Sequence, residues 1–256
     1  MKAALILTEG RSGSNWLGSL TSNTGYMGRS EEWLDTNKLG FEPDNFEDFM
    51  NAVIQKASTD NDRLCVKIFP RHLNWVYSRY KVDFIKSLMD RSETGLILLK
   101  RQDRIRQAIS HARGMMTRKF RSTSPSTGKE VYDFDAICQR CWYIDRSYAS
   151  WYCYLGVNMY KYHEFIYEEL LNEPRKYVDC VSDILSVPKP ESIHSALEIQ
   201  RDGTTEEWVE RFKSDIQEKD FLGPLQDKPA SRTLENLVKF ASKKTMSGST
   251  QLFSHY

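Results

Sequence analysis

The chain has 256 residues, and its 36 Lys and Arg residues against 35 Asp and Glu residues leave a formal net charge of +1. A balance this close to zero argues against a protein that binds nucleic acid over its whole surface. A hydrophobic content of 40% with 12% aromatic residues is too high for a disordered chain. We therefore expect a folded protein with a sizeable buried core.

The cysteines and the N-terminal sequence bear on location. Five cysteines, an odd number without regular spacing, argue against a disulfide framework and favour a reducing compartment. The apolar run at residues 3–7 is too short for a signal-peptide core, and no stretch approaches the ~18 apolar residues of a membrane span. The expected location is the cytoplasm, while export without a signal peptide stays open.

Apolar runs and helical periodicities alternate along the chain. Short apolar runs predict buried strands at 3–8, 64–69, 95–99 and 160–166. Apolar side chains at three- and four-residue spacing predict helices at 15–22, 46–54, 82–89, 102–120, 133–155, 174–185 and 206–212. This alternation indicates an α/β fold with a mainly parallel central sheet flanked by helices, which binds ligands at the carboxyl ends of its strands.

The same pass along the chain predicts a single domain over residues 1–256, since no second strand–helix series and no internal repeat is visible. The Ser-, Thr-, Pro- and Gly-rich stretch predicts a mobile loop at about 121–132. Residues 214–256 stay unassigned. The aromatic helix at 133–155 has surplus apolar surface, which fits either the core or an interface between subunits.

A loop of small residues between Thr8 and Trp16 joins the first strand to the first helix. Backbone N–H groups at such a helix start converge on one point, and the helix dipole adds partial positive charge there. Ser12 and Ser14 add hydroxyl donors, and Arg11 adds a cationic fork. The loop lacks the Gly-x-x-x-x-Gly-Lys-Ser/Thr pattern of nucleoside triphosphatases. It predicts an anion site, with an ordinary tight turn as the alternative.

A second basic segment follows the strand at 95–99. Between Lys100 and Arg121 there are eight Lys or Arg residues and one acid, Asp103. In a chain of balanced charge this is a local positive patch, which suits a second anion site. A solvated helix face is one alternative, and nucleic-acid binding is another, weakened because no aromatic platform accompanies the charge.

These two segments resemble the cofactor-binding segments of sulfotransferases that use 3′-phosphoadenylyl sulfate (PAPS). Thr-x-x-Arg-Ser-Gly-Ser at 8–14 is similar to their 5′-phosphosulfate loop, and Arg11 resembles the bacterial trehalose 2-sulfotransferase family in particular. Arg101 and Ser110, nine residues apart, resemble the 3′-phosphate segment. Segments 167–174, 185–190 and 197–211 are also similar, in the same order.

The resemblance implies a P-loop-like sulfotransferase fold, PAPS as the sulfuryl donor, and no metal. Arg11 would also be catalytic, because it would stabilise charge on the departing bisphosphate. The residues that the resemblance implies in cofactor binding are Arg11, Ser12, Gly13, Ser14, Asn15, Trp16, Arg101, Ser110 and Arg201.

A general base is expected in the segment that follows the first helix. The resemblance places the family's catalytic Glu on Glu32, with the neighbouring Glu31 as an alternative and a helix-start carboxylate pair without a base role as another. Arg29 stands where the family has an acid that contacts sugar, and Ser30 replaces a Pro. We therefore predict that Arg29 and Glu31 bind the acceptor. These departures weaken the case for trehalose and suit an anionic acceptor.

The expected activity is transfer of a sulfuryl group from PAPS to a hydroxyl of a carbohydrate or glycolipid, by in-line displacement with a Glu base. A P-loop-like small-molecule kinase and a catalytically silent nucleotide- or anion-binding protein are the alternatives, with RNA binding a remote one. No nucleic-acid partner and no membrane span are expected. A homodimer stays open, because the trehalose enzymes are dimers.

Three further features give weaker expectations. Lys67, near a strand end, is either a phosphate or sulfate contact or a solvated side chain. His72 is expected at the surface, with a place on the acceptor side as the alternative. The pair Cys138 and Cys141 lacks the further ligands of a zinc site, which predicts two buried thiols.

Overall fold

The computed structural model describes residues 1–118, 128–195, 197 and 203–219, which build a five-stranded sheet in the order β2-β3-β1-β4-β5. The central strand β1 (Lys2–Leu7) pairs in parallel with β3 (Arg63–Ile68) and with β4 (Glu93–Lys100). On the far side of β4 lies the parallel strand β5 (His163–Ile166), and β2 (Ser58–Thr59) is an antiparallel edge strand beside β3. The predicted α/β fold with a mainly parallel sheet is confirmed.

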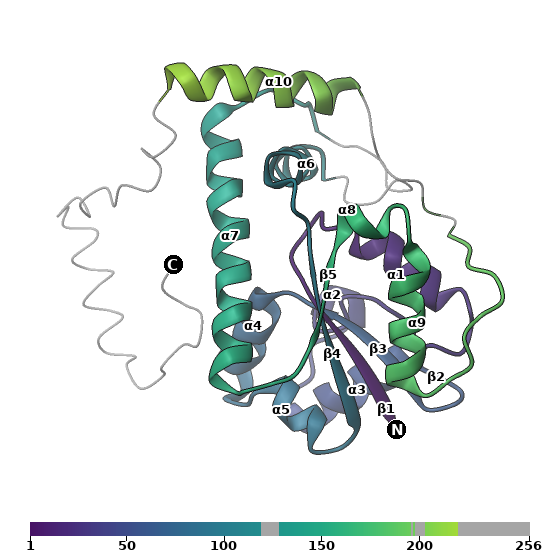
Figure 1. The fold of residues 1–256 in the computed structure, drawn as a ribbon. Coiled ribbons are helices and arrows are strands. Elements are labelled where there is room, and N and C mark those ends of the chain that lie inside the picture. Colours follow the sequence, from purple (N-terminus) through teal and green to yellow (C-terminus); the bar gives the residue numbers. More distant parts are fainter. Residues whose placement is uncertain (119–127, 196, 198–202, 220–256) are drawn as a thin grey trace, which may run out of the picture.

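Helices cover both faces of this sheet (Figure 1). Alternate residues of β1 enter different cores: Ala3, Leu5 and Leu7 face one, and Ala4 and Ile6 face the other. The smaller core lies under α1 (Ser14–Ser22), α8 (Tyr167–Leu170) and α9 (Pro174–Leu185). The larger core is covered by α2 (Thr36–Leu39), α3 (Phe46–Ala57), α4 (Pro70–Tyr80), α5 (Phe84–Met89), α6 (Arg104–Thr117), α7 (Phe134–Val157) and α10 (Gly203–Glu218).

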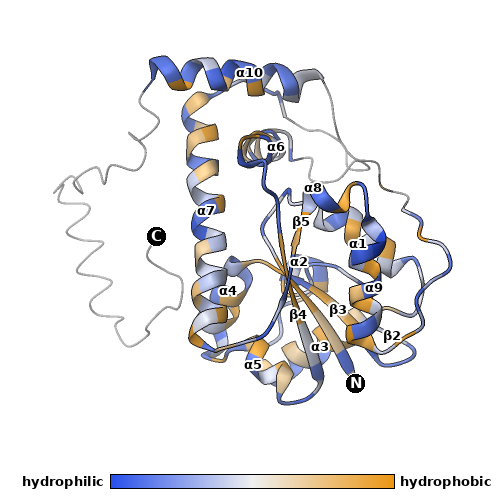
Figure 2. Ribbon diagram, in the orientation of Figure 1, coloured by the Kyte–Doolittle hydropathy of each residue, from blue (hydrophilic) through white to orange (hydrophobic). Residues whose placement is uncertain are grey.

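The long helix α7 ties the larger core to the end of β1. Trp151 is fully buried, and its Nε1 donates a hydrogen bond to the carbonyl oxygen of Thr8 at 2.9 Å. The hydroxyl of Tyr148 reaches the carbonyl oxygen of Leu99, at the end of β4, at 3.4 Å. Figure 2 shows that the hydrophobic residues of α7 alternate with hydrophilic ones along the helix. Its buried aromatic side therefore supports the carboxyl ends of the two central strands.

The predicted strands and helices are all present, with ends that differ by a few residues. The bounds of α9 agree with the predicted 174–185, whereas α10 is longer than the predicted 206–212. Cys138 and Cys141 are buried free thiols, as predicted.

The helix α4 was not predicted, because Pro70 looked only like the end of a strand. In the structure Pro70 occupies the first turn of α4, where its missing N–H is not needed. The surface position predicted for His72 is wrong, because His72 lies in the first turn of α4 and on its buried side. The His72 side chain is 6% exposed, and its Nδ1 accepts a hydrogen bond from the N–H of Phe69 at 3.2 Å.

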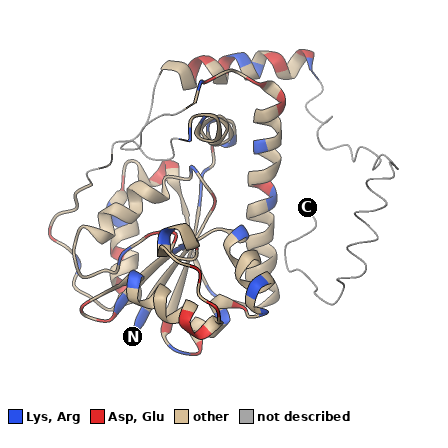
Figure 3. Cartoon of the chain, turned by 180° about the vertical axis from the view of Figure 1, so that it is seen from behind, with Lys and Arg blue, Asp and Glu red and all other residues tan. Residues whose placement is uncertain are grey.

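Charged residues of both signs are spread over most elements, and they alternate along α10 (Figure 3). Among the described residues no helix is long and apolar enough to cross a membrane. The predicted mobile loop falls partly on residues 119–127, and most of the unassigned C-terminal segment falls on 220–256; both ranges lie outside the described residues.

Candidate functional site

The loop after β1 turns into α1 through two left-handed residues. Arg11 has a φ of 64° and Gly13, the N-cap of α1, has a φ of 84°. No side chain among the described residues caps α1, and its first turn contains no acidic residue, so the N–H groups there suit an anion. A Cβ on Gly13 would lie 2.1 Å from Cδ2 of Tyr167, so this position has no room for a side chain.

The buried hydroxyl groups of Thr8 and Ser12 hold the same loop against the end of β4. The Thr8 hydroxyl lies 2.7 Å from the Ser12 hydroxyl and 2.7 Å from the carbonyl oxygen of Leu99, as donor in either contact. The Ser12 side chain is fully buried. The predicted contribution of its hydroxyl to anion binding has no support in this geometry, whereas its backbone N–H belongs to the loop.

Arg11 joins the two segments that the sequence predicts as anion sites. Its Nε donates to the hydroxyl of Ser110 at 2.7 Å, and Nη1 of Arg101 donates to the Arg11 carbonyl oxygen at 3.4 Å. Burial, together with the charges of Arg101 and Arg113, lowers the pKa of Arg11 to about 10. The guanidinium groups therefore repel one another and are partly desolvated, and a bound anion would offset this unfavourable free energy.

A hollow of about 240 Å³ opens beside these arginines, between α6, α8 and α10, and we call it the α6–α10 hollow. Nε of Arg101 has no hydrogen-bond partner among the described residues, and its nearest carboxylate oxygen, Oε1 of Glu168, is 3.6 Å away. Across the hollow, Glu206 of α10 forms an ion pair with Arg106. The lining residues are Arg101, Asp103, Arg106, Ser110, Tyr167, Glu168, Leu171, Thr205 and Glu206.

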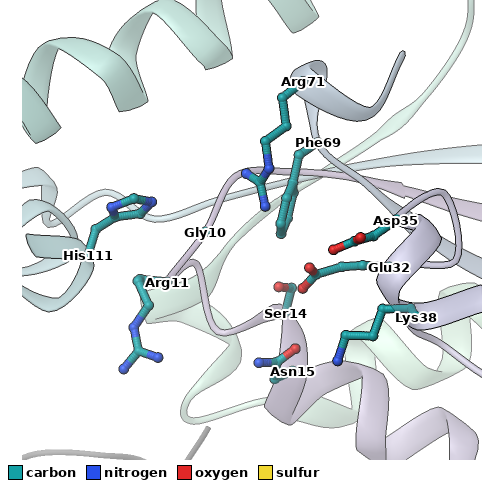
Figure 4. A pocket seen from close by; sticks show the side chains of 10 residues that line it. All are labelled: Gly10, Arg11, Ser14, Asn15, Glu32, Asp35, Lys38, Phe69, Arg71 and His111. Atoms are coloured by element: carbon teal, nitrogen blue, oxygen red, sulfur yellow. The ribbon is translucent and has the colours of Figure 1, made fainter. Parts of the chain in front are cut away.

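On the other side of Arg11 lies a second cavity of about 270 Å³, the central cavity. Figure 4 shows its wall, with Arg11 and His111 opposite Glu32, Asp35 and Lys38. Its lining residues are Gly10, Arg11, Ser14, Asn15, Glu32, Asp35, Lys38, Phe69, Arg71 and His111. Arg11 therefore borders this cavity and contacts Ser110 of the α6–α10 hollow.

Backbone pairing holds the predicted base segment against β3. The N–H of Lys67 donates to the carbonyl oxygen of Glu31 at 3.0 Å, which forms an isolated parallel bridge between Glu31 and Val66. Gly28 allows the close approach: its φ is 75°, and a Cβ there would lie 2.4 Å from the backbone nitrogen of Cys65. The two glutamates thus depend on the sheet for their position.

Lys67 is the buried cation of this segment. Its side chain is 1% exposed, and Nζ lies 3.1 Å from Oε1 of Glu32 and 3.6 Å from Oε1 of Glu31. Nζ also donates to Oδ1 of Asn15 in α1. Burial lowers the pKa of Lys67, and the charge of Glu32 opposes this shift. Lys67 is therefore not solvated, and it links Asn15 of α1 to both carboxylates; its contact with a phosphate or sulfate stays a prediction.

The structure separates the residues predicted around the acceptor. Glu32 lines the central cavity, whereas Arg29 and Glu31 line a neighbouring hollow of about 240 Å³ together with Asn15. Trp16 packs its ring edge-on to Tyr167 at 6.3 Å. Arg201 lies outside the described residues.

Arg71 and His111 of the central cavity, and Glu9 behind Arg71, have no place in the sequence-based prediction. Glu9 is fully buried and pairs with Arg71 at 2.9 Å, and His111 is 7% exposed. A carboxylate directly after an apolar strand was the available signal for a buried ion pair. The described residues contain no group of three or more His, Cys, Asp or Glu side chains that could hold a metal ion.

Comparison with known proteins identifies the family. A family model described as Stf0 sulphotransferase matches residues 77–215, which is more than half of the chain. Among solved structures, the sulfotransferase domain from the Synechococcus PCC 7002 olefin synthase is similar over 96% of this chain and 95% of its own, at 16% identity and a TM-score of 0.43. That likeness is too distant to inform the site. No curated protein matches the sequence. The chain belongs to the Stf0 sulphotransferase family of PAPS-dependent transferases.

Proposed function

We propose that this protein transfers a sulfuryl group from PAPS to a hydroxyl group of a carbohydrate or glycolipid acceptor. The observation that carries the proposal is the position of Arg11. It borders the central cavity, where Glu32 lies, and its Nε contacts Ser110 of the α6–α10 hollow. One side chain therefore lies between a place for the donor nucleotide and a place for the acceptor.

The donor side suits a doubly phosphorylated adenosine. The uncapped start of α1 and the N–H groups of the loop would hold the 5′-phosphate. Arg101, whose Nε lacks a partner among the described residues, would hold the 3′-phosphate together with the Ser110 hydroxyl. Burial and then the charge of Arg101 lower the pKa of Arg11, which supports this assignment because a bound anion would compensate the clustered charge.

When bound, PAPS supplies the sulfuryl group and the 3′,5′-bisphosphate leaving group. Arg11 stabilises the negative charge that develops on the leaving side, a contribution worth about 10²–10³ in rate. A carboxylate oxygen of Glu32 takes the proton of the acceptor hydroxyl, worth about 10²–10⁴. As that O–H bond breaks, the acceptor oxygen bonds to sulfur and the bond from sulfur to the 5′-phosphate oxygen breaks.

Glu32 is preferred to Glu31 as the base because of where each side chain lies. Glu32 borders the central cavity with Arg11, whereas Glu31 borders the neighbouring hollow. Lys67 holds the Glu32 carboxylate at 3.1 Å and thereby fixes its direction. Arg29 and Glu31 keep a proposed role in contacting parts of the acceptor that extend beyond the central cavity.

A cytoplasmic location and a homodimer also belong to the proposal. All five cysteines are free thiols, which supports a reducing compartment. Val157, the last residue of α7, and Met159 just beyond it are strongly exposed, which supports a contact with a second subunit.

The test measures transfer from ³⁵S-labelled PAPS to a panel of sugars and glycolipids, and calorimetric binding of adenosine 3′,5′-bisphosphate. Glu32→Gln should abolish transfer and leave bisphosphate binding nearly intact, whereas Arg11→Ala should weaken both. Glu42→Gln, an exposed carboxylate that pairs with Arg79, is the matched control. Full turnover by Glu32→Gln would disprove the base. Bisphosphate binding without transfer to any acceptor would favour a silent binding protein, and Mg²⁺-dependent ATP binding would favour a kinase.

A further inference from the structure

The buried ion pair between Glu9 and Arg71 has no role in the sulfuryl transfer proposed above. Glu9 is fully buried at the end of β1, and its Oε1 accepts hydrogen bonds from the Gly10 N–H at 2.7 Å and from Nη1 of Arg71 at 2.9 Å. A buried carboxylate needs such partners. The pair therefore anchors the Arg71 side chain to the loop that also carries Arg11.

A second contact fixes the plane of the Arg71 guanidinium. Its Cζ lies 4.2 Å from the centroid of the Phe69 ring. The Arg71 side chain is nevertheless 46% exposed and lines the central cavity, into which it extends beside Phe69 (Figure 4). Burial lowers the pKa of Arg71, but Glu9, Tyr143 and Glu32 together raise it above its ordinary value, so the group stays charged. Because a guanidinium has five N–H donors, Glu9 and Tyr143 together leave others for a ligand.

Charge is distributed unevenly around this cavity. Arg11, His111 and Arg71 form one side, and Glu32 and Asp35 lie on the other together with a single cation, Lys38 (Figure 4). Burial and the charges of neighbouring arginines, Arg71 and Arg11 among them, lower the pKa of His111 to about 4, so the imidazole is neutral at pH 7. An acceptor that presents a hydroxyl to Glu32 would place its opposite end among the guanidinium groups.

We propose that Arg71 is a specificity-determining residue that binds an anionic group of the acceptor, so that the acceptor is an acidic carbohydrate or acidic glycolipid. The inference rests on the proposed function only in that the reacting hydroxyl lies at Glu32. Carboxylate, sulfate and phosphate groups all match the planar donor fork of Arg71.

The Glu9–Arg71 pair is neutral when seen from a distance. It therefore does not attract anions over a long range, and it favours them through direct hydrogen bonds. Glu9 and Phe69 already restrict the Arg71 side chain, so little rotamer freedom is lost when a ligand binds. A charge-assisted, bidentate contact of this kind favours the anionic ligand by about 10- to 100-fold.

The experiment uses two probes that differ in one group, 4-nitrophenyl β-D-glucuronide and 4-nitrophenyl β-D-glucoside. Their affinities are measured by calorimetry on the full chain saturated with adenosine 3′,5′-bisphosphate. The parent protein should bind the glucuronide about 10- to 100-fold more tightly. Because loss of Arg71 alone would leave Glu9 buried and unpaired, the variant is the double substitution Glu9→Gln with Arg71→Gln. Arg79→Gln, on the same helix and paired with Glu42, is the control.

In the double variant the ratio of the two affinities should fall to about one, while the affinity for the bisphosphate stays within about twofold. The Arg79→Gln protein should keep the parent ratio. The proposal is overturned if the parent shows no preference for the glucuronide, if the preference survives in the double variant, or if the double variant loses bisphosphate binding. A preference that persists in a protein without transferase activity would support Arg71 and reject the proposed function, so the two failures are distinguishable.

Discussion

Replacement of Lys67 by Met tests how the candidate base is held. The Lys67 ammonium is 1% exposed and lies 3.1 Å from a Glu32 oxygen and 3.6 Å from a Glu31 oxygen. Met has a similar length and no charge, so the variant removes the cation and retains most of the packing volume. Two largely buried carboxylates then lose their shared partner.

The magnitude follows from these distances. At an effective dielectric constant of about 20, a unit charge pair at 3.1 Å contributes about 5 kcal/mol, and the pair at 3.6 Å somewhat less. The cost of burying Lys67, visible in its lowered pKa, offsets much of this attraction in the folded protein. Removal of one partner from a buried pair typically costs about 3–5 kcal/mol, because the remaining charge stays uncompensated. We expect Lys67→Met to lose that much unfolding free energy.

Urea denaturation of the purified protein measures the loss. Lys38→Met is the matched control: Lys38 is an exposed lysine of the same cavity wall, and its replacement should change stability by less than about 0.5 kcal/mol. The double variant Lys67→Met with Glu31→Gln should recover part of the loss, since one of the two carboxylates that lost the Lys67 charge is then neutral. Equal stability of the parent and Lys67→Met would refute the reasoning and place the two glutamates in water.

Three further outcomes are expected. Gly13→Ala should weaken bisphosphate binding at least tenfold in calorimetry, because the φ of 84° and the 2.1 Å approach of Tyr167 exclude a side chain. The control protein Gly25→Ala should bind the bisphosphate normally, since Gly25 has a similar φ of 79° but open space around it. Arg101→Ala should reduce the preference for adenosine 3′,5′-bisphosphate over 5′-AMP by about 10- to 100-fold, and an unchanged preference would place the 3′-phosphate elsewhere. Burial lowers the pKa of His72 to about 3 in the folded protein. The folded state with a neutral His72 therefore keeps its full stability above the unfolded pKa near 6.5, and it loses stability as the pH falls from there towards 3. At pH 5 the parent should have lost about 2 kcal/mol of unfolding free energy relative to pH 7.5, whereas His72→Asn should not show this loss. Denaturation at pH 7.5 and pH 5 measures the difference.

Local patterns were sufficient for most of the fold. Apolar runs predicted β1, β3, β4 and β5, because strands buried on both faces have continuous apolar sequences. Apolar residues at three- and four-residue spacing predicted the long helices, because each of these helices buries one face. The helix α4 was missed because a proline after a strand is compatible with two outcomes, a chain reversal or a helix start, and only packing selects between them.

Only part of the candidate site lies in patterns that the sequence can reveal, and the limit is physical. The loop at 8–16 and the segment around Arg101 could be recognised because their chemistry lies in consecutive residues. The pairing of Glu9 with Arg71 spans 62 positions, and that of Lys67 with Glu32 spans 35, so neither leaves a local pattern. The residues that line the central cavity come together only through the order of the strands.

Neighbouring strands set the spacing between the proposed proton acceptor and the departing group. Thr8, the residue after β1, continues the sheet, because its N–H donates to the carbonyl oxygen of Ile68 at 3.0 Å. The segment at Glu31 pairs with β3 through the backbone hydrogen bond from Lys67 to the Glu31 carbonyl oxygen. Adjacent strands lie about 4.8 Å apart in every sheet, whatever side chains they carry. A redesign of α2 and α4 could therefore exchange one acceptor for another without disturbing the geometry of the reacting atoms.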